Sequence, residues 1–265
     1  MQMILTTVTD EVFNDDLKKS VEIATQEGIT HFEIRRIEGR RFPLIEEDDL
    51  KKLKIFKDEY ALTYTAVSPG TFKVPLRSKE FNYHRGELMD KTMAMAEELD
   101  VNKIIIFSVK RDPSDQAGDL QQVIEELGNV ARRAEKNGFT VMIENEPGFW
   151  ADTSENCLKI LKAINMKKLR LNWDPGNLFK TGEHDYKPGY ERLKSFIANV
   201  HLKDAKLVEG ENLYVPLGEG EINYQQQIAD LRADGYKGCL TVETHCHPLP
   251  DTFIQSVAYL KKLLG

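Results

Sequence analysis

The chain has 265 residues, of which 41% are hydrophobic and 30% charged, and its net charge is −7. Such an acidic chain, with only short basic clusters, is a poor nucleic-acid binder. It contains no apolar run of the roughly 20 residues that cross a bilayer, and its first residues do not resemble a signal peptide. We therefore expect no nucleic-acid or membrane partner.

Cysteine usage favours a reducing compartment. Cys157, Cys239 and Cys246 show no CxxC spacing, and their odd number leaves at least one thiol unpaired. We therefore expect a cytoplasmic protein. A homo-oligomer is compatible with this composition.

Strands and helices are predicted to alternate through the first half of the chain. Apolar runs and alternating apolar residues predict strands at residues 4–9, 31–35, 62–67 and 103–109. Apolar residues at helical spacing predict helices at about 14–27, 46–59, 78–99 and 119–136.

The same alternation continues in the second half. The predicted strands are residues 140–144, 169–174, 197–203 and 239–243. The predicted helices are residues 154–164, about 190–195, 222–233 and 252–264.

Eight strands therefore alternate with eight helical segments, without a linker or a shift in composition. Strict alternation implies parallel strands joined by right-handed crossovers. Eight such units in about 250 residues predict an α/β fold, a single (β/α)₈ TIM barrel spanning residues 1–265. The alternative is an open doubly wound sheet, although no GxGxxG or GxxxxGK[ST] motif follows any predicted strand.

Four of the later strands carry polar residues on one face and apolar residues on the other. In the strand at 197–203, Val200 and Leu202 point one way, while His201 and Lys203 point the other. A parallel strand covered by helices should be apolar on both faces, so this polar face must line a site. Three further strands end on a carboxylate of the same kind: Glu144, Asp174 and Glu243.

These four side chains are predicted to meet. The carboxyl ends of barrel strands carry the chemistry, and the four residues come from consecutive strands. Three converging carboxylates repel one another unless a cation compensates their charge. We predict that one divalent metal ion is bound by four ligands: Glu144, Asp174, His201 and Glu243. Oxygen-rich ligation with one imidazole suits Mn²⁺, our first choice, or Mg²⁺, Co²⁺ or Zn²⁺.

Such a site suits proton transfer next to a carbonyl group. A hydroxy-ketone can chelate the metal, which would polarise the carbonyl and stabilise an enediolate. Glu144 and Glu243 approach from different strands, so one would remove the α-proton and the other return it. Return to the same carbon makes an epimerase, and return to the neighbouring carbon makes an aldose–ketose isomerase.

At these residues the chain resembles the xylose isomerase-like barrel superfamily, in the branch of sugar-phosphate isomerases and epimerases. The resemblance spans nearly the whole chain and is strongest at Ile143-Glu144-Asn145-Glu146, Asp174-Pro175-Gly176-Asn177, His201-Leu202-Lys203-Asp204, Pro216-Leu217-Gly218-Glu219-Gly220 and Thr241-Val242-Glu243. It implies the same four metal ligands, the two glutamates as acid and base, and a sugar or sugar phosphate as the small-molecule partner.

Two of these segments also resemble pentulose-5-phosphate 3-epimerases. This resemblance implies that Asn177 and Lys203 lie near substrate oxygens, with a phosphate as a candidate for Lys203. Alternatively, Asn177 caps the next turn and Lys203 pairs with Asp204 or Glu219.

Three further residues are substrate-contact candidates. Glu33 and Arg35 face the barrel interior near its mouth, by strand parity. Trp150, next to Phe149, is expected to form an apolar wall that excludes water from the site.

Departures from the resemblance narrow the function. Trp150 stands where ketose 3-epimerases resembling tagatose epimerase carry a second glutamate, and Asn177 replaces their histidine, which argues against a free-ketose 3-epimerase. The strand ends at residues 66–68 and 107–109 lack the extra histidines of the superfamily's DNA-repair endonucleases. A metal-dependent dehydratase of a keto-polyol or dehydroshikimate-like substrate is the alternative, and a non-catalytic sugar-binding barrel is the second.

Overall fold

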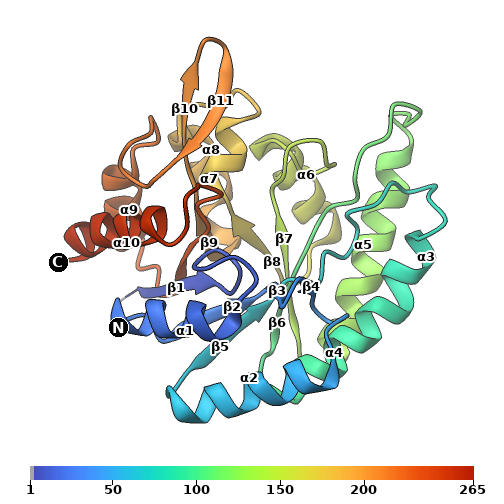
Figure 1. Cartoon of the computed structure of the whole chain (residues 1–265). Helices are drawn as coiled ribbons and strands as arrows, with labels where there is room; N and C mark the ends of the chain where they lie inside the picture. Colours follow the sequence, from blue (N-terminus) through green and yellow to red (C-terminus); the bar gives the residue numbers. More distant parts are fainter. Residues whose placement is uncertain (1–2) are drawn as a thin grey trace.

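Parallel strands close into a barrel in the order β1-β12-β9-β8-β7-β6-β5-β2, as seen in the computed structural model, which describes residues 3–265 (Figure 1). The barrel strands are β1 (Ile4–Val8), β2 (His31–Ile34), β5 (Thr63–Val67), β6 (Lys103–Ile106), β7 (Thr140–Glu144), β8 (Leu169–Trp173), β9 (Ile197–Leu202) and β12 (Cys239–Val242). All eight predicted strands and the closed barrel are confirmed, and the open doubly wound sheet is wrong.

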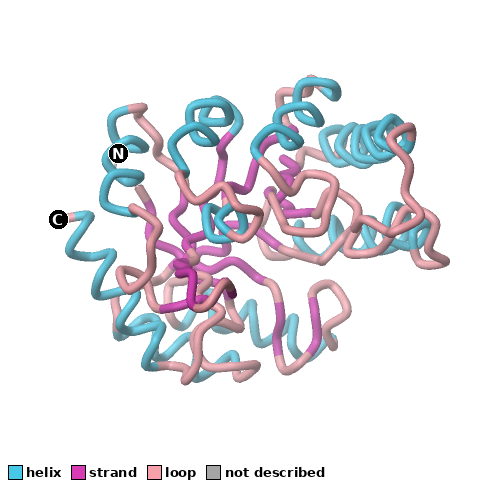
Figure 2. Tube along the Cα trace, turned by 90° about the horizontal axis from the view of Figure 1, so that it is seen from above, coloured by secondary structure: helices cyan, strands magenta, loops and turns pink. Residues whose placement is uncertain are grey.

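Helices cover the outside of the barrel, and in the view from above most of them lie around the barrel strands (Figure 2). The longer helices are α1 (Leu17–Gln26), α2 (Glu47–Glu59), α4 (Met89–Glu97), α5 (Asp119–Lys136), α6 (Ser154–Ile164), α8 (Tyr186–Leu193), α9 (Tyr224–Ala233) and α10 (Asp251–Leu264). In α5, Val123, Leu127, Val130 and Ala134 recur at helical spacing and are all buried. Such apolar stripes hold the helices against the strands.

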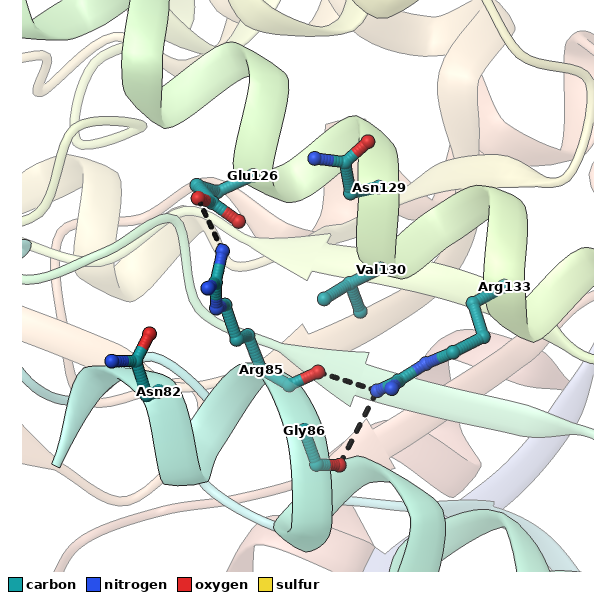
Figure 3. Close-up of a pocket in the computed structure, with 7 residues that line it drawn as sticks. All are labelled: Asn82, Arg85, Gly86, Glu126, Asn129, Val130 and Arg133. Atoms are coloured by element: carbon teal, nitrogen blue, oxygen red, sulfur yellow. Dashed lines mark hydrogen bonds and ion pairs between the residues drawn. The ribbon is translucent and has the colours of Figure 1, made fainter.

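The tract at 78–99 is not the single regular helix that its apolar spacing predicts. It consists of α3 (Phe81–Tyr83), a π-helical turn (His84–Leu88) and α4. The carbonyl oxygens of Arg85 and Gly86 accept hydrogen bonds from Nη2 of Arg133 in α5 (Figure 3). Hydrogen bonds from Arg133 of α5 thus satisfy two carbonyl oxygens of this widened turn. The apolar spacing within the tract does not reveal such an interaction with another helix.

A cavity of about 310 Å³ lies between this turn and α5 (Figure 3). Arg85 donates to Glu126 Oε1 at 2.8 Å, and Arg133 is engaged with the backbone of the turn. Both guanidinium groups therefore stabilise the packing of the two segments.

Two short hairpins were missing from the predicted pattern of elements. β3 (Arg36–Ile37) pairs with β4 (Arg40–Arg41), and β10 (Asp204–Val208) pairs with β11 (Glu211–Val215). Each loop is a Glu-Gly pair in which both residues have positive φ, at 38–39 and 209–210. Two-residue loops of this kind match the twist of the strands that they join. A Glu-Gly pair between short β-rich runs was therefore the sequence signal that could have predicted each hairpin.

Asp204 fixes the base of the second hairpin. Its carboxylate, fully buried, accepts backbone N–H hydrogen bonds from Gly218 at 2.9 Å, Gly220 at 3.0 Å and Ile222 at 3.3 Å. A Cβ on Gly220 would lie 2.0 Å from Oδ1 of Asp204. The loop at 216–222 therefore wraps around this carboxylate, and its glycines allow the close approach.

The short helix α7 (Pro175–Phe179) follows β8 and lies against β9. Asp174 caps it, and Pro175 occupies its first turn. A Cβ on Gly176 would lie 2.2 Å from the carbonyl oxygen of Lys203. Glycine at 176 is therefore what allows α7 to pack this close to the end of β9.

The three cysteines are buried free thiols. Within residues 3–265, no helix has both the length and the apolar character that a bilayer span requires.

The close approach at Gly176 predicts that Gly176→Ala destabilises the fold. The added methyl group has no room beside the Lys203 carbonyl, and such overpacking costs about 1–3 kcal/mol. Urea unfolding followed by circular dichroism measures this loss. Gly86→Ala is the control, because nothing lies within 4 Å of a Cβ there; equal stability of the two variants would contradict the packing argument.

Candidate metal centre

Four side chains converge at the carboxyl ends of neighbouring strands. Glu144 ends β7, Asp174 follows β8, His201 lies in β9 and Glu243 follows β12. All four are buried, and one ligand-type atom of each lies within 4.8 Å of those of the others. The structure thus brings together the four residues that strand parity selected, and this cluster could bind a metal.

The unsatisfied atoms of this cluster fit a bound cation. Asp174 Oδ2, His201 Nδ1 and Glu243 Oε2 are buried and have no hydrogen-bond partner among residues 3–265. His201 Nδ1 lies 2.8 Å from Glu243 Oε2. Lys203 Nζ, 2.9 Å from Asp174 Oδ2 and 3.1 Å from Glu243 Oε2, is a cation shared by these two carboxylates. Leaving hydrogen-bonding capacity unused in a buried site is costly, and a divalent cation would add an electrostatic partner for all three atoms. The donor set of carboxylate oxygens and one imidazole suits such an ion.

The two oxygens of Asp174 have different neighbours. Oδ1 accepts from the backbone N–H of Asn177 at 2.8 Å, at the start of α7, whereas Oδ2 lies 2.9 Å from Lys203 Nζ. The amide of Asn145 holds the Asp174 backbone through two hydrogen bonds, donating to its carbonyl at 2.7 Å and accepting from its N–H at 2.8 Å. Sequence reasoning assigned no role to Asn145, although it directly follows the candidate ligand Glu144.

Glu33 orients His201 from across the barrel. Its Oε2 lies 2.8 Å from His201 Nε2, and the Glu33 side chain is fully buried. A carboxylate on the far nitrogen keeps Nδ1 available and increases its strength as a ligand. We expected Glu33 to contact substrate. Instead it lies behind the histidine, and among residues 3–265 it is not part of the lining of the cavity above the four-residue cluster.

The protonation of His201 reflects its acidic surroundings. Burial alone would lower its pKa, but the carboxylates of Glu33, Glu243 and Glu144 raise the pKa well above the usual value. Burial raises the pKa of Asp174. Positive charge is therefore strongly favoured at this position, whether a proton or a metal ion supplies it.

Glu243 is surrounded by cations. Burial would raise its pKa, but the charges of Lys203, His201, His245 and Arg35 hold the pKa well below the usual range. Lys203 Nζ lies 3.1 Å from Glu243 Oε2, and His245 Nε2 lies 3.0 Å from Oε1. Glu243 therefore remains a carboxylate.

Arg35 joins this glutamate to two acidic residues that follow β1. Its Nε donates to Asp10 Oδ1 at 2.9 Å, its Nη2 to Glu11 Oε1 at 2.6 Å, and its Nη1 to Glu243. Glu11, Glu243 and His245 also cluster closely enough to resemble a second metal site. Arg35 already supplies the positive charge there, so this second cluster is an arginine-centred ion-pair network.

Asn177 and Lys203, both expected near substrate, line the cavity above the four-residue cluster. Lys203 Nζ lies 2.9 Å from Asp174 Oδ2 and 3.3 Å from Asn177 Oδ1. The alternative in which Lys203 pairs with Asp204 or Glu219 is wrong, because Lys203 Nζ forms its ion pairs with Asp174 and Glu243, and Asp204 binds backbone N–H groups instead.

Asn177 also donates, through Nδ2, to Glu144 Oε1 at 3.2 Å and to Glu146 Oε2 at 2.8 Å. It does not cap α7, a role that Asp174 performs. The side chain of Asn177 therefore links two glutamates of the cavity.

The cavity above the cluster has a volume of about 210 Å³. Glu144, His201 and Glu243 line it, together with Phe107 and with Tyr214 of β11. Sequence reasoning missed Tyr214, because it did not predict the hairpin that carries this residue.

Trp150 does not line this cavity in the part of the chain that the structure describes. It is buried in the main core, where the Arg111 guanidinium lies 4.3 Å from its ring. Phe107 lines the cavity instead, and its ring centroid lies 5.3 Å from that of Phe149. An aromatic ring thus faces the cavity, but it belongs to Phe107 and not to Trp150.

The xylose isomerase-like TIM-barrel family model matches residues 21–263. An uncharacterised protein of Methanocaldococcus jannaschii is 29% identical over 121 residues, which cover 44% of this chain and 41% of that protein. Inosose dehydratase of Geobacillus thermodenitrificans is 25% identical over 159 residues, covering 54% of this chain and 52% of the enzyme. The chain thus spans about half the length, or less, of these curated relatives.

Solved structures share the whole fold. A D-tagatose 3-epimerase-like protein superposes with a TM-score of 0.81 at 22% identity, covering 99% of this chain and 97% of that one. The probable 3-DHS dehydratase of Bacillus anthracis gives 0.79 at 19% identity, with 98% and 99% covered. A Mycobacterium smegmatis barrel protein in complex with magnesium gives 0.79 at 13%, with 100% and 97% covered. With the family model matching most of its length, the chain belongs to the xylose isomerase-like TIM-barrel family.

Proposed function

We propose that this protein is a divalent-metal-dependent isomerase or epimerase that moves a proton next to the carbonyl group of a sugar or sugar phosphate. The observation that carries the proposal is the buried cluster of Glu144, Asp174, His201 and Glu243, in which three ligand-type atoms form no hydrogen bond among residues 3–265 and three of the side chains line a cavity. Epimerases and a magnesium complex among the structural neighbours support it.

In this proposal, Glu144 and Glu243 act as the acid and base. When bound, a divalent cation would polarise the substrate carbonyl and offset negative charge developing on its oxygen. Asn172 and Asn177 each donate to Glu144 at 3.2 Å, and His245 and Arg35 hold one oxygen of Glu243. The two glutamates are thereby fixed on different strands, so that one can take the α-proton and the other can return it.

A dehydratase is the second candidate. Inosose dehydratase and a probable 3-DHS dehydratase are among the similar proteins. Glu146 also lines the cavity and gives it a third carboxyl group beside the acid–base pair. Loss of water would require removal of the α-proton and departure of the β-hydroxyl with a proton from an acid, the role that Glu146 would take.

Metal binding is tested first by mass spectrometry. We expect purified protein incubated with Mn²⁺ to retain close to one ion per chain, because the four proposed ligands converge on a single position. Glu144→Gln, Asp174→Asn, His201→Asn and Glu243→Gln should each lose the ion while remaining folded by circular dichroism. Wild type that stays metal-free after incubation with Mn²⁺, Mg²⁺, Co²⁺ and Zn²⁺ would contradict the metal site and the enzyme proposal, leaving the sugar-binding barrel.

Glu33→Gln tests the orientation of His201. Loss of the carboxylate behind Nε2 should weaken Mn²⁺ binding about 10- to 100-fold, the usual cost of removing such a partner. Isothermal titration calorimetry measures the affinity. Glu126→Gln, which removes a carboxylate on the outer face of the barrel, is the control. Unchanged affinity in Glu33→Gln would show that the imidazole needs no such support.

Exchange in deuterated water tests the chemistry. With Mn²⁺ present, we expect the protein to exchange the α-proton of a ketose or ketose phosphate for deuterium. Proton NMR measures the loss of the α-proton signal. Glu144→Gln and Glu243→Gln, assayed at saturating Mn²⁺, should each lower turnover by about 10²- to 10⁴-fold.

The same spectra separate the two reactions. A new epimer or aldose supports the isomerase proposal, whereas an alkene or aromatic product from an inosose or 3-dehydroshikimate supports the dehydratase. In the second case, Glu146→Gln should abolish water loss and spare exchange. No exchange with any substrate by metal-loaded protein would contradict both.

A further inference from the structure

Three cations of the cavity lack an acidic partner. Arg41, Lys73 and Lys180 all line it, yet none forms an ion pair with a carboxylate of residues 3–265. Arg35 and Lys203, which line the same cavity, each form ion pairs with carboxylates. The cavity therefore contains two kinds of cation: those that hold the glutamates in place and those left free.

Arg41 is held in place by uncharged groups. It comes from the β3–β4 hairpin, and its Nε donates to the Ser68 carbonyl while its Nη2 donates to Ser68 Oγ, both at 3.1 Å. A Cβ on Gly70 would lie 2.7 Å from Arg41 Nε. The loop after β5 is thus shaped to receive this guanidinium group, and it uses two of its five N–H donors.

The positive charge of Arg41 is not neutralised by a neighbouring carboxylate among residues 3–265. Burial, reinforced by the nearby charge of Arg35, lowers the pKa of Arg41 to about 10. The group is still charged at neutral pH. Arg41 is half-buried, and withdrawing a cation from water is costly unless it is paired. The side chains around it provide no direct carboxylate contact.

Aromatic faces hold the two lysines. Lys73, an exposed residue at the rim of the cavity, places its Nζ 4.0 Å from the ring centroid of Phe107. Lys180 places its Nζ 3.7 Å from the ring centroid of Tyr214. A cation–π contact positions an ammonium group without neutralising its charge. Both lysines are therefore oriented and still able to bind an anion.

We propose that Arg41 and Lys73, with Lys180, bind an anionic group of the substrate, a carboxylate or a phosphate, while the carbonyl end lies at Glu144 and Glu243. This inference rests on the proposed function and specifies its substrate class: a sugar acid or a sugar phosphate rather than a neutral sugar. Guanidinium and ammonium groups together suit either anion. Lys203, expected from sequence to meet a phosphate, is engaged by Asp174 and Glu243 instead.

The test compares Arg41→Gln and Lys73→Gln with Arg40→Gln. Arg40 is the adjacent residue of the same hairpin, but it pairs with Asp49 and does not line the cavity. Exchange of the α-proton is measured on Mn²⁺-loaded protein with a ketose phosphate, a keto-sugar acid and a neutral ketose. Loss of a charged hydrogen bond should raise KM for the anionic substrate about 10- to 100-fold in the first two variants, with KM for the neutral ketose unchanged.

The anion that loses affinity in Arg41→Gln identifies whether the group is a phosphate or a carboxylate. Equal use of neutral and anionic substrates by wild type would overturn the inference while leaving the proposed function intact. So would an Arg41→Gln variant that behaves like Arg40→Gln.

Calorimetry keeps the inference testable if no substrate is turned over. Inorganic phosphate and acetate are titrated into the same Mn²⁺-loaded proteins. Binding of either anion that is lost in Arg41→Gln and kept in Arg40→Gln supports the anion site independently of catalysis. Absence of binding, or equal binding in all variants, overturns it.

Discussion

Buried negative charge at one end of the barrel is the constraint on which the rest of the site depends. Glu144, Asp174 and Glu243 converge where they have little contact with water, and such an arrangement is unstable unless positive charge accompanies it. Lys203 and Arg35 supply part of that charge through direct ion pairs. His201 Nδ1, Asp174 Oδ2 and Glu243 Oε2, which form no hydrogen bond among residues 3–265, mark where further positive charge would be favoured.

The cations that meet this constraint are themselves fixed from several strands. Arg35 is held by Asp10 and Glu11, which follow β1, and His201 by Glu33 of β2. The first strands of the chain therefore set the geometry of candidate metal ligands supplied by the last ones. Closure of the barrel makes this possible, because β1 pairs with both β2 and β12.

Parity along single strands was enough to predict the eight strands and the four residues that converge. Each strand reports which side chains face inward, and consecutive order places neighbouring strand ends together. Parity also placed Glu33 inside the barrel, but it could not show that His201 lies within 2.8 Å, because that pair depends on barrel closure. The wall residue differed for a similar reason: the loop after β7 places Trp150 in the core against Arg111, while Phe107 of a neighbouring strand end faces the cavity.

The cations of the cavity fall into two regions, one in which they are paired with carboxylates and one in which they are not. Near the cluster, each cation is bound to a carboxylate, so the basic groups there hold the acidic side chains of the cluster in place. Arg41, Lys73 and Lys180 are instead held by a serine and by two aromatic rings, which impose position without removing charge. A substrate with one carbonyl and one anionic end can satisfy both parts of such a cavity in only one orientation. That polarity would present the α-carbon to the same pair of glutamates at every turnover, which is what stereospecific proton transfer requires.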